Sequence, residues 1–229
     1  MKKWLNDLLN LFYPAVCHLC GNSLSSHERF ICIPCIETLP RTGYHRNLKN
    51  PMEERFAGQF PFEFATGHFF YSKDSSLSQL VQDMKYRKFP SIGNKLGEIA
   101  GRELFISGFL SDIDYIVPVP MHFIKKAIRG YNQVDNIAQG LSKETDIPVI
   151  NALKMVRLRK TQTSLSKTQR YNNAKSLFKP YKKIDLNHKR VLLVDDICTT
   201  GATMGSAAKT LTDSYPKIKL YLFSLGVTF

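Results

Sequence analysis

The sequence has no apolar run that approaches the length of a membrane span, although 43% of its 229 residues are hydrophobic. The first twelve residues carry two lysines and an apolar stripe. Asn6, Asp7 and Asn10 interrupt that stripe, and no small-residue cleavage site follows it. We therefore expect no transmembrane segment, no secretion signal and a cytoplasmic location. A short amphipathic helix docked on the protein is expected instead, with contact to a membrane surface as the alternative.

Acidic residues are scarce in one part of the chain. Residues 121–190 contain 16 Lys+Arg but only 4 Asp+Glu, whereas residues 1–120 contain 13 and 12 and residues 191–229 contain 3 of each. Nearly all of the formal net charge of +13 therefore lies in one stretch. Concentrated positive charge favours a polyanionic partner, namely a phosphorylated small molecule, a nucleic acid or both. A solvated basic face without a partner is the alternative.

Four of the five cysteines form two closely spaced pairs, Cys17-x2-Cys20 and Cys32-x2-Cys35. Two such pairs match a tetrahedral structural Zn²⁺ site, and reducing conditions would favour a metal over disulfides. Four thiolates leave no open position for a substrate, so the metal would fold a segment too small to build its own core. An iron–sulfur cluster and two disulfides are the alternatives.

The most informative segment runs from Val191 to Thr203. Four apolar residues predict a buried strand, two acids, Asp195 and Asp196, follow it, and Thr199-Thr200-Gly201-Ala202-Thr203 forms a hydroxyl-rich loop. Residues 204–211 can continue as a helix. A loop at a helix N-terminus binds anions through backbone N–H groups, and adjacent carboxylates suit the vicinal hydroxyls of a sugar.

This order of features predicts recognition of a ribose 5-phosphate. The segment is not a Walker loop, because it has no Gly-Lys-Ser/Thr and its acids precede the loop. A plain strand–turn–helix connection with capping threonines is the alternative.

Strands and helices alternate after the first sixty residues. Apolar runs predict strands at 63–71, 114–120, 147–156, 190–194 and 219–228, and helical spacing predicts helices at 77–86, 96–105 and 134–141. Such alternation predicts an α/β fold with a mostly parallel sheet and flanking helices, whose ligands bind at the carboxyl ends of the strands. We expect an N-terminal helix and metal module at 1–40, a linker at 41–61 and the α/β domain at 62–229.

The segment from Asp195 to Thr203 closely resembles the phosphoribosyl pyrophosphate (PRPP) motif of type I phosphoribosyltransferases. The resemblance implies that Asp195 and Asp196 contact the ribose hydroxyls and that the loop from Thr199 to Thr203 holds the 5-phosphate. It also implies a pyrophosphate-binding loop at 118–122, a closing loop at 157–173, and Mg²⁺ bound together with PRPP.

An ordered set of short matches resembles the competence protein F family, in which a zinc module precedes a phosphoribosyltransferase-like domain. The matches are the four paired cysteines, Val117–Pro120, Arg129–Gln133, Arg159 to Leu165, Gln169 to Asn172, and Asp195 to Thr203. The family implies handling of single-stranded DNA during natural transformation, with DNA-uptake proteins as partners. Arg129, Arg159 and Arg170 are then candidates for phosphate or nucleic-acid contacts, with plain surface charge as the alternative.

Three functions are consistent with these features. The first is a PRPP-fold protein, weakly catalytic or non-catalytic, that binds single-stranded DNA. The second is an active phosphoribosyltransferase that joins ribose 5-phosphate to a base or amine and releases pyrophosphate. The sequence shows no nucleobase pocket, so we assign no catalytic residue and place this function second. The third is a PRPP-sensing regulator that uses the metal module as an interaction surface.

Overall fold

A computed structural model describes residues 15–87, 89–156, 177–181 and 184–228. The helix expected over the first twelve residues and the loop expected at 157–173 lie outside these residues, as do Arg159 and Arg170. Among the described residues, no helix combines the length and the hydropathy that crossing a membrane would need.

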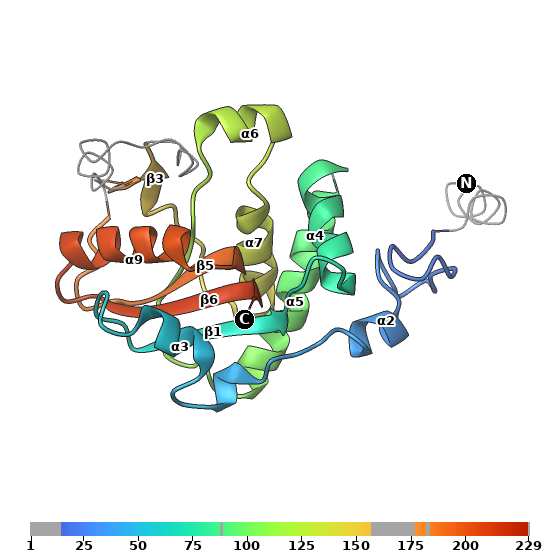
Figure 1. The fold of residues 1–229 in the computed structure, drawn as a ribbon, viewed down its shortest axis with the longest axis horizontal. Helices are drawn as coiled ribbons and strands as arrows, with labels where there is room; N and C mark the ends of the chain where they lie inside the picture. The colour runs from blue at the N-terminus through green and yellow to red at the C-terminus, as the bar shows by residue number, and fades with distance from the viewer. Residues whose placement is uncertain (1–14, 88, 157–176, 182–183, 229) are drawn as a thin grey trace.

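The centre of the molecule is a four-stranded sheet in which all three strand pairs are parallel (Figure 1). In spatial order the strands are β1 (Phe64–Phe70), β6 (Lys219–Val227), β5 (Arg190–Cys198) and β2 (Tyr115–Pro118). A parallel bridge between Ile116 and Val149 continues the sheet beyond β2. The predicted α/β fold with a mostly parallel sheet is confirmed.

Helices cover both faces of the sheet, and a short antiparallel pair stands apart from it. The helices are α2 (Ile33–Glu37), η1 (Tyr44–Arg46), α3 (Pro51–Phe56), α4 (Ser76–Tyr86), α5 (Pro90–Ile106), α6 (Phe123–Arg129), α7 (Gln133–Thr145) and α9 (Ala202–Ser214). The pair is β3 (Leu153–Met155) with β4 (Phe178–Pro180). Figure 1 shows α9 and α3 on one side of the sheet and α4, α5 and α7 on the other.

Strand β5 explains why the chain folds into these layers. Leu192 and Val194 pack in the core with α4, α5 and α7, whereas Val191 and Leu193 pack in a second core with α3 and α9. Successive side chains of a strand point to opposite faces, so a continuous apolar run buries both of them. The central strand is therefore held between two hydrophobic cores.

Three elements differ from the sequence prediction. The strand expected at 147–156 is interrupted, because its first part pairs only with Ile116 of β2 and its last part leaves to pair with β4. Helix α6 was not predicted: Phe123, Ile124, Ala127 and Ile128 do recur at helical spacing, but the helix is only seven residues long and buries none of them. The stretch 41–61, expected as a linker, contains η1 and α3, with Met52 and Phe56 fully buried. Its role as a boundary between folding units stays a prediction.

Helices α5 and α7 cross at a backbone-to-backbone contact. A Cβ atom added to Gly97 would lie 2.3 Å from the carbonyl oxygen of Ile137, and one added to Gly140 would lie 2.2 Å from that of Asn94. Both obstacles are backbone atoms, which cannot move aside as a flexible side chain would. The two glycines therefore set the distance between these helices, and α7 in turn carries residues of the site described below.

We predict that Gly97→Ala destabilises the fold by about 1–3 kcal/mol, because the overpacking outweighs the better helix propensity of alanine. Urea denaturation of the purified protein measures this change. Arg102→Ala, at an exposed position of the same helix, is the control and should stay within about 0.5 kcal/mol of the parent. Equal stabilities for the two variants would contradict the assigned close contact.

Candidate functional site

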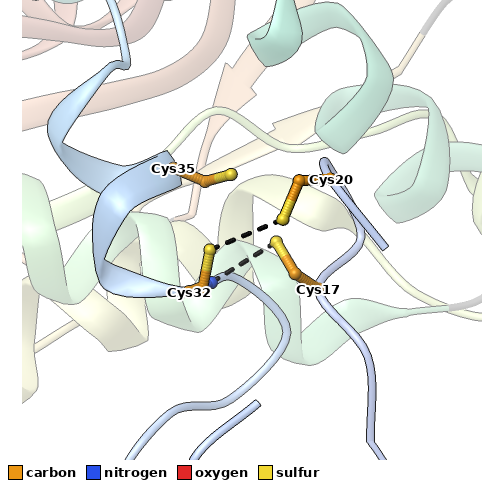
Figure 2. Close-up of side chains that lie close together, drawn as sticks. All are labelled: Cys17, Cys20, Cys32 and Cys35. Atoms are coloured by element: carbon orange, nitrogen blue, oxygen red, sulfur yellow. Dashed lines mark hydrogen bonds between the residues drawn. The ribbon is translucent and has the colours of Figure 1, made fainter. Parts of the chain in front are cut away.

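The four paired cysteines come together at one point (Figure 2). Their sulfur atoms all lie within 4.8 Å of one another, and the Sγ atoms of Cys20 and Cys32 are 3.7 Å apart. Four sulfurs around a tetrahedral Zn²⁺ would be about 3.8 Å apart, given a Zn–S distance of about 2.3 Å. The described cysteines are free thiols, and this donor set fits a closed, four-coordinate metal centre.

Backbone N–H groups prepare the first cysteine to act as a thiolate. The N–H groups of Leu19 and Cys32 each donate to the Sγ atom of Cys17 over 3.4 Å. Burial opposes ionisation of Cys17, but the N–H groups of Cys32, Cys20 and Leu19 outweigh it and lower the pKa of the thiol to about 6. A thiolate at neutral pH is the form that binds a metal.

The predicted phosphate loop lies where β5 leads into α9. It forms a hollow lined by Asp195, by Ile197 and Cys198, and by the residues from Thr199 to Met204. Helix α9 begins after Gly201 without a side-chain cap, so the N–H groups of its first turn are available to an anion. Thr199, Thr200, Gly201, Ala202 and Thr203 are thus brought together with Asp195.

Gly201 is required by its backbone and by its neighbours. Its φ of 75° lies in the left-handed region, and an added Cβ would lie 2.8 Å from the ring of Phe56. Arg55 supports the loop from the same helix, α3. Its guanidinium donates to the carbonyl oxygens of Cys198, over 3.1 Å, and Thr228, over 2.5 Å.

The two acids lie inside β5 rather than after it, which corrects the sequence prediction. Strand pairing continues past them, because Asp195 stands beside Ser224 and Cys198 beside Val227 of β6. Neighbouring strand residues point to opposite faces. Asp195 accordingly faces the hollow, while Asp196 faces α4 and α7.

Asp196 is held by three donors. Its Oδ2 lies 2.5 Å from Nζ of Lys85 on α4 and accepts from Nε2 of Gln133 over 2.8 Å, and its Oδ1 accepts from the N–H of Ile197 over 2.7 Å. Burial opposes its charge, but the Lys85 ammonium outweighs burial and, with these hydrogen bonds, holds the pKa of Asp196 below its usual value.

Asp195 has the opposite electrostatic environment. Burial and the neighbouring carboxylate of Asp196 raise its pKa well above the usual value, although its Oδ1 accepts from the N–H of Asp196 over 2.9 Å. The carboxyl groups are therefore unequal: Asp196 is the fixed anion, and Asp195 takes up a proton more readily.

Arg129 is connected to Asp196 indirectly, through the side chain of Gln133. It ends α6, and its guanidinium donates to Oε1 of Gln133, whose amide in turn donates to Asp196. Its charge also lies 5.7 Å from the ring centre of Tyr86. The structure therefore places Arg129 behind Asp196 rather than at the phosphate loop.

The segment 118–122, expected to bind pyrophosphate, lies beside the end of β5. The N–H of Val119 donates to the carbonyl oxygen of Val194 over 2.8 Å, and the Asn132 amide donates to the carbonyl oxygen of Val119. His122 then caps α6 by accepting from the N–H of Ile124. The segment thus shares the carboxyl edge of the sheet with the two acids.

Sequence reasoning missed three residues that support the site. Lys85 begins the basic and aromatic run Lys85-Tyr86-Arg87-Lys88-Phe89, and Gln133 ends the Arg129–Gln133 match. Neither pattern indicates a contact with Asp196. Arg55 lies in the stretch expected as a linker and had no sequence signal. Each of them is supplied by an element distant in the chain from the residue it contacts.

Comparisons with known proteins agree with this architecture. Residues 107–224 match the phosphoribosyl transferase domain family. Competence protein F of Haemophilus influenzae is 36% identical over 140 residues, which cover 59% of this chain and 61% of that protein. DNA utilization protein YhgH of Salmonella typhi is 26% identical over 215 residues, which cover 88% of this chain and 92% of that protein.

Among solved structures, the glutamine PRPP amidotransferase from B. subtilis, complexed with ADP and GMP, is 19% identical with a TM-score of 0.42. That match covers 59% of this chain and 26% of the other. The chain spans about three fifths of the length of the Haemophilus relative that it matches. The resemblance predicted from the sequence motifs is confirmed. Because the family match covers more than half of its residues, this chain belongs to the phosphoribosyl transferase domain family, and it is a homologue of competence protein F.

Proposed function

We propose that this protein binds PRPP or a related ribose 5-phosphate at the carboxyl end of β5 and uses that site while handling single-stranded DNA. The observation that carries the first part is the buried pair Asp195 and Asp196, followed directly by an uncapped helix N-terminus. The first feature suits sugar hydroxyls and the second suits a phosphate.

The residues have distinct roles in this proposal. Asp195, which lines the hollow, and Asp196, kept ionised by Lys85, accept hydrogen bonds from the ribose hydroxyls at the carboxyl end of β5. The 5-phosphate is held by the N–H groups and hydroxyls of the loop from Thr199 to Thr203. Mg²⁺ bound with PRPP would neutralise part of the diphosphate charge. We further propose that the four cysteines bind Zn²⁺ in a structural role.

The DNA-handling part rests on charge and on the relatives. Residues 121–190 carry an excess of 12 positive charges, and the described Arg129 and Tyr86 place a guanidinium beside an aromatic ring. Basic grooves with interleaved aromatic side chains bind single strands through phosphates and stacked bases. The names of the relatives refer to competence and DNA utilization. Single-stranded DNA and uptake proteins are therefore the proposed partners.

The competing proposal is an active phosphoribosyltransferase. The family match and the hollow where β5 leads into α9 support this proposal, in which that hollow would be the sugar-phosphate half of the active site. Incubation of the zinc-loaded protein with Mg²⁺–PRPP and a panel of bases, with pyrophosphate release monitored, separates the two. Release that depends on one base would favour the enzyme, whereas salt-dependent DNA binding without release would favour DNA handling.

We predict that the double variant Asp195→Asn, Asp196→Asn binds ribose 5-phosphate and PRPP at least tenfold more weakly, because neutral amides replace the anionic acceptors of the hydroxyls. Calorimetry measures the affinity, and circular dichroism checks that the fold is retained. The matched control is Asp74→Asn with Asp213→Asn, two exposed acids. Unchanged affinity in the folded site variant would exclude this pocket as the sugar site.

We predict that neutralising Arg157, Arg159, Lys160 and Arg170 with glutamine weakens binding to single-stranded DNA. If all four contact phosphates, the slope of log affinity against log salt should become shallower by about 3, since each contact contributes about 0.7. Filter binding at several salt concentrations measures this slope. Neutralising Lys73, Arg102, Lys209 and Lys217 removes the same charge elsewhere and is the control. An equal change in both variants would indicate general charge attraction instead of a defined contact.

A further inference from the structure

Helix α4 lies between the cysteine module and the two acids of β5. Asp83 and Lys85 are two residues apart on this helix, so their side chains leave it about 200° apart around its axis. Asp83 contacts the cysteine module and Lys85 contacts Asp196. One turn of helix therefore joins two sites that are far apart in the sequence.

The contact with the module is made by the residue between its first two cysteines. Nδ1 of His18 lies 2.8 Å from Oδ2 of Asp83, and the amide of Gln79 donates to the carbonyl oxygen of His18. The rings of His18 and Phe89 meet edge to face, with centres 4.7 Å apart. Asp83 is only 2% exposed, and its other oxygen lies 3.3 Å from Arg87. The turn between Cys17 and Cys20 is thus fastened to α4 by a partly buried polar contact.

The contact with the site is partly buried as well, since the Lys85 side chain is 22% exposed and that of Asp196 11%. Lys85 is the only residue with a positively charged side chain within 4.0 Å of the Asp196 carboxylate in the described part of the chain. A buried carboxylate that loses its cation partner is strongly destabilised and tends to take up a proton. The position of α4 therefore controls the charge on Asp196.

The same turn also contacts the Arg129–Gln133 segment. The Tyr131 hydroxyl donates to the carbonyl oxygen of Met84, and Arg129 stacks over Tyr86. These contacts fix the side of the turn that faces the Arg129–Gln133 segment. On the side of the cysteine module, α4 shares a buried core with Cys17 and Cys32. The His18–Asp83 and Gln79–His18 contacts are the polar links between them.

We propose that the cysteine module positions the sugar site through His18, Asp83 and Lys85. Metal bound by the four cysteines fixes the turn from Cys17 to Cys20, the turn holds Asp83, and α4 then places the Lys85 ammonium on Asp196. His18 and Asp83 are positioning residues that do not touch the ligand. By thermodynamic linkage, a ligand at Asp196 also tightens the module. This inference rests on the proposed binding of ribose 5-phosphate.

The test is a double-mutant cycle on the full-length, zinc-loaded protein with ribose 5-phosphate as the probe. The variants are His18→Ala, Asp83→Asn and both together, with Asp213→Asn as the control. We expect each single variant to bind about tenfold more weakly while retaining one Zn²⁺ per chain. The double variant should bind no more weakly than the weaker single variant, because both changes break one link. Unchanged affinities, or losses that multiply, would overturn the inference.

Hydrogen exchange provides a readout that needs no ligand. Removing the metal with a chelator should speed exchange in α4 and at the N–H of Ile197, which donates to Asp196, but not in α9 on the opposite face of the sheet. If this pattern appears in a protein that binds no ribose 5-phosphate, the link stands and the proposed function fails. If ribose 5-phosphate binds but the exchange rate at Ile197 is the same with and without metal, the proposed function stands and the link through His18, Asp83 and Lys85 fails.

Discussion

The ion pair between Lys85 and Asp196 is the interaction on which the site depends. Two adjacent carboxyl groups, both less than a tenth exposed, sit in the central strand of the sheet. Two buried like charges repel each other, and burial alone would keep both protonated. An ammonium 2.5 Å from Asp196 resolves this conflict for one of them, and it must come from an element outside the sheet. Helix α4 supplies this ammonium through Lys85, and α7 adds the amide of Gln133.

The phosphate loop has a parallel requirement on the other face of the sheet. Gly201 must adopt a left-handed conformation against the ring of Phe56, and Arg55 donates to the carbonyl oxygens of Cys198, just before the loop, and of Thr228, just after β6. Both supporting residues come from α3, in a stretch with little sequence pattern. The acids and the loop are therefore each supported by a helix, α4 and α3 respectively, that comes before β5 and β6 in the chain. Helix α4 places the Lys85 ammonium on Asp196, and α3 places the ring of Phe56 against Gly201.

Local patterns explain how much of this was predictable. The strand, acids, loop and helix between Val191 and Ser214 are contiguous, so their order alone predicted which residues come together in the hollow where β5 leads into α9. The clustering of the four paired cysteines was equally predictable, because the spacing of metal-binding cysteines is a local property of the sequence. Lys85 and Arg55 were not, because they lie 111 and 143 residues from Asp196 and Cys198. No periodicity encodes such a contact. Helix α6 was missed because its seven residues are fewer than the window of about 11 residues over which helical periodicity is read.

The structure also separates two acids that the motif treats alike. Asp196, satisfied by Lys85, Gln133 and a backbone N–H, has its charge fixed before any ligand arrives. Asp195 faces the loop, and its raised pKa makes its charge responsive to its surroundings. A cation or hydroxyl donor that enters the hollow would favour the ionised form of Asp195, so ligand binding and deprotonation are coupled at that residue. In the proposed function, the fixed acid would orient the sugar, and the responsive acid would let the site adjust its charge to the ligand. A strand buried on both faces makes this division unavoidable, because neighbouring side chains must enter different environments.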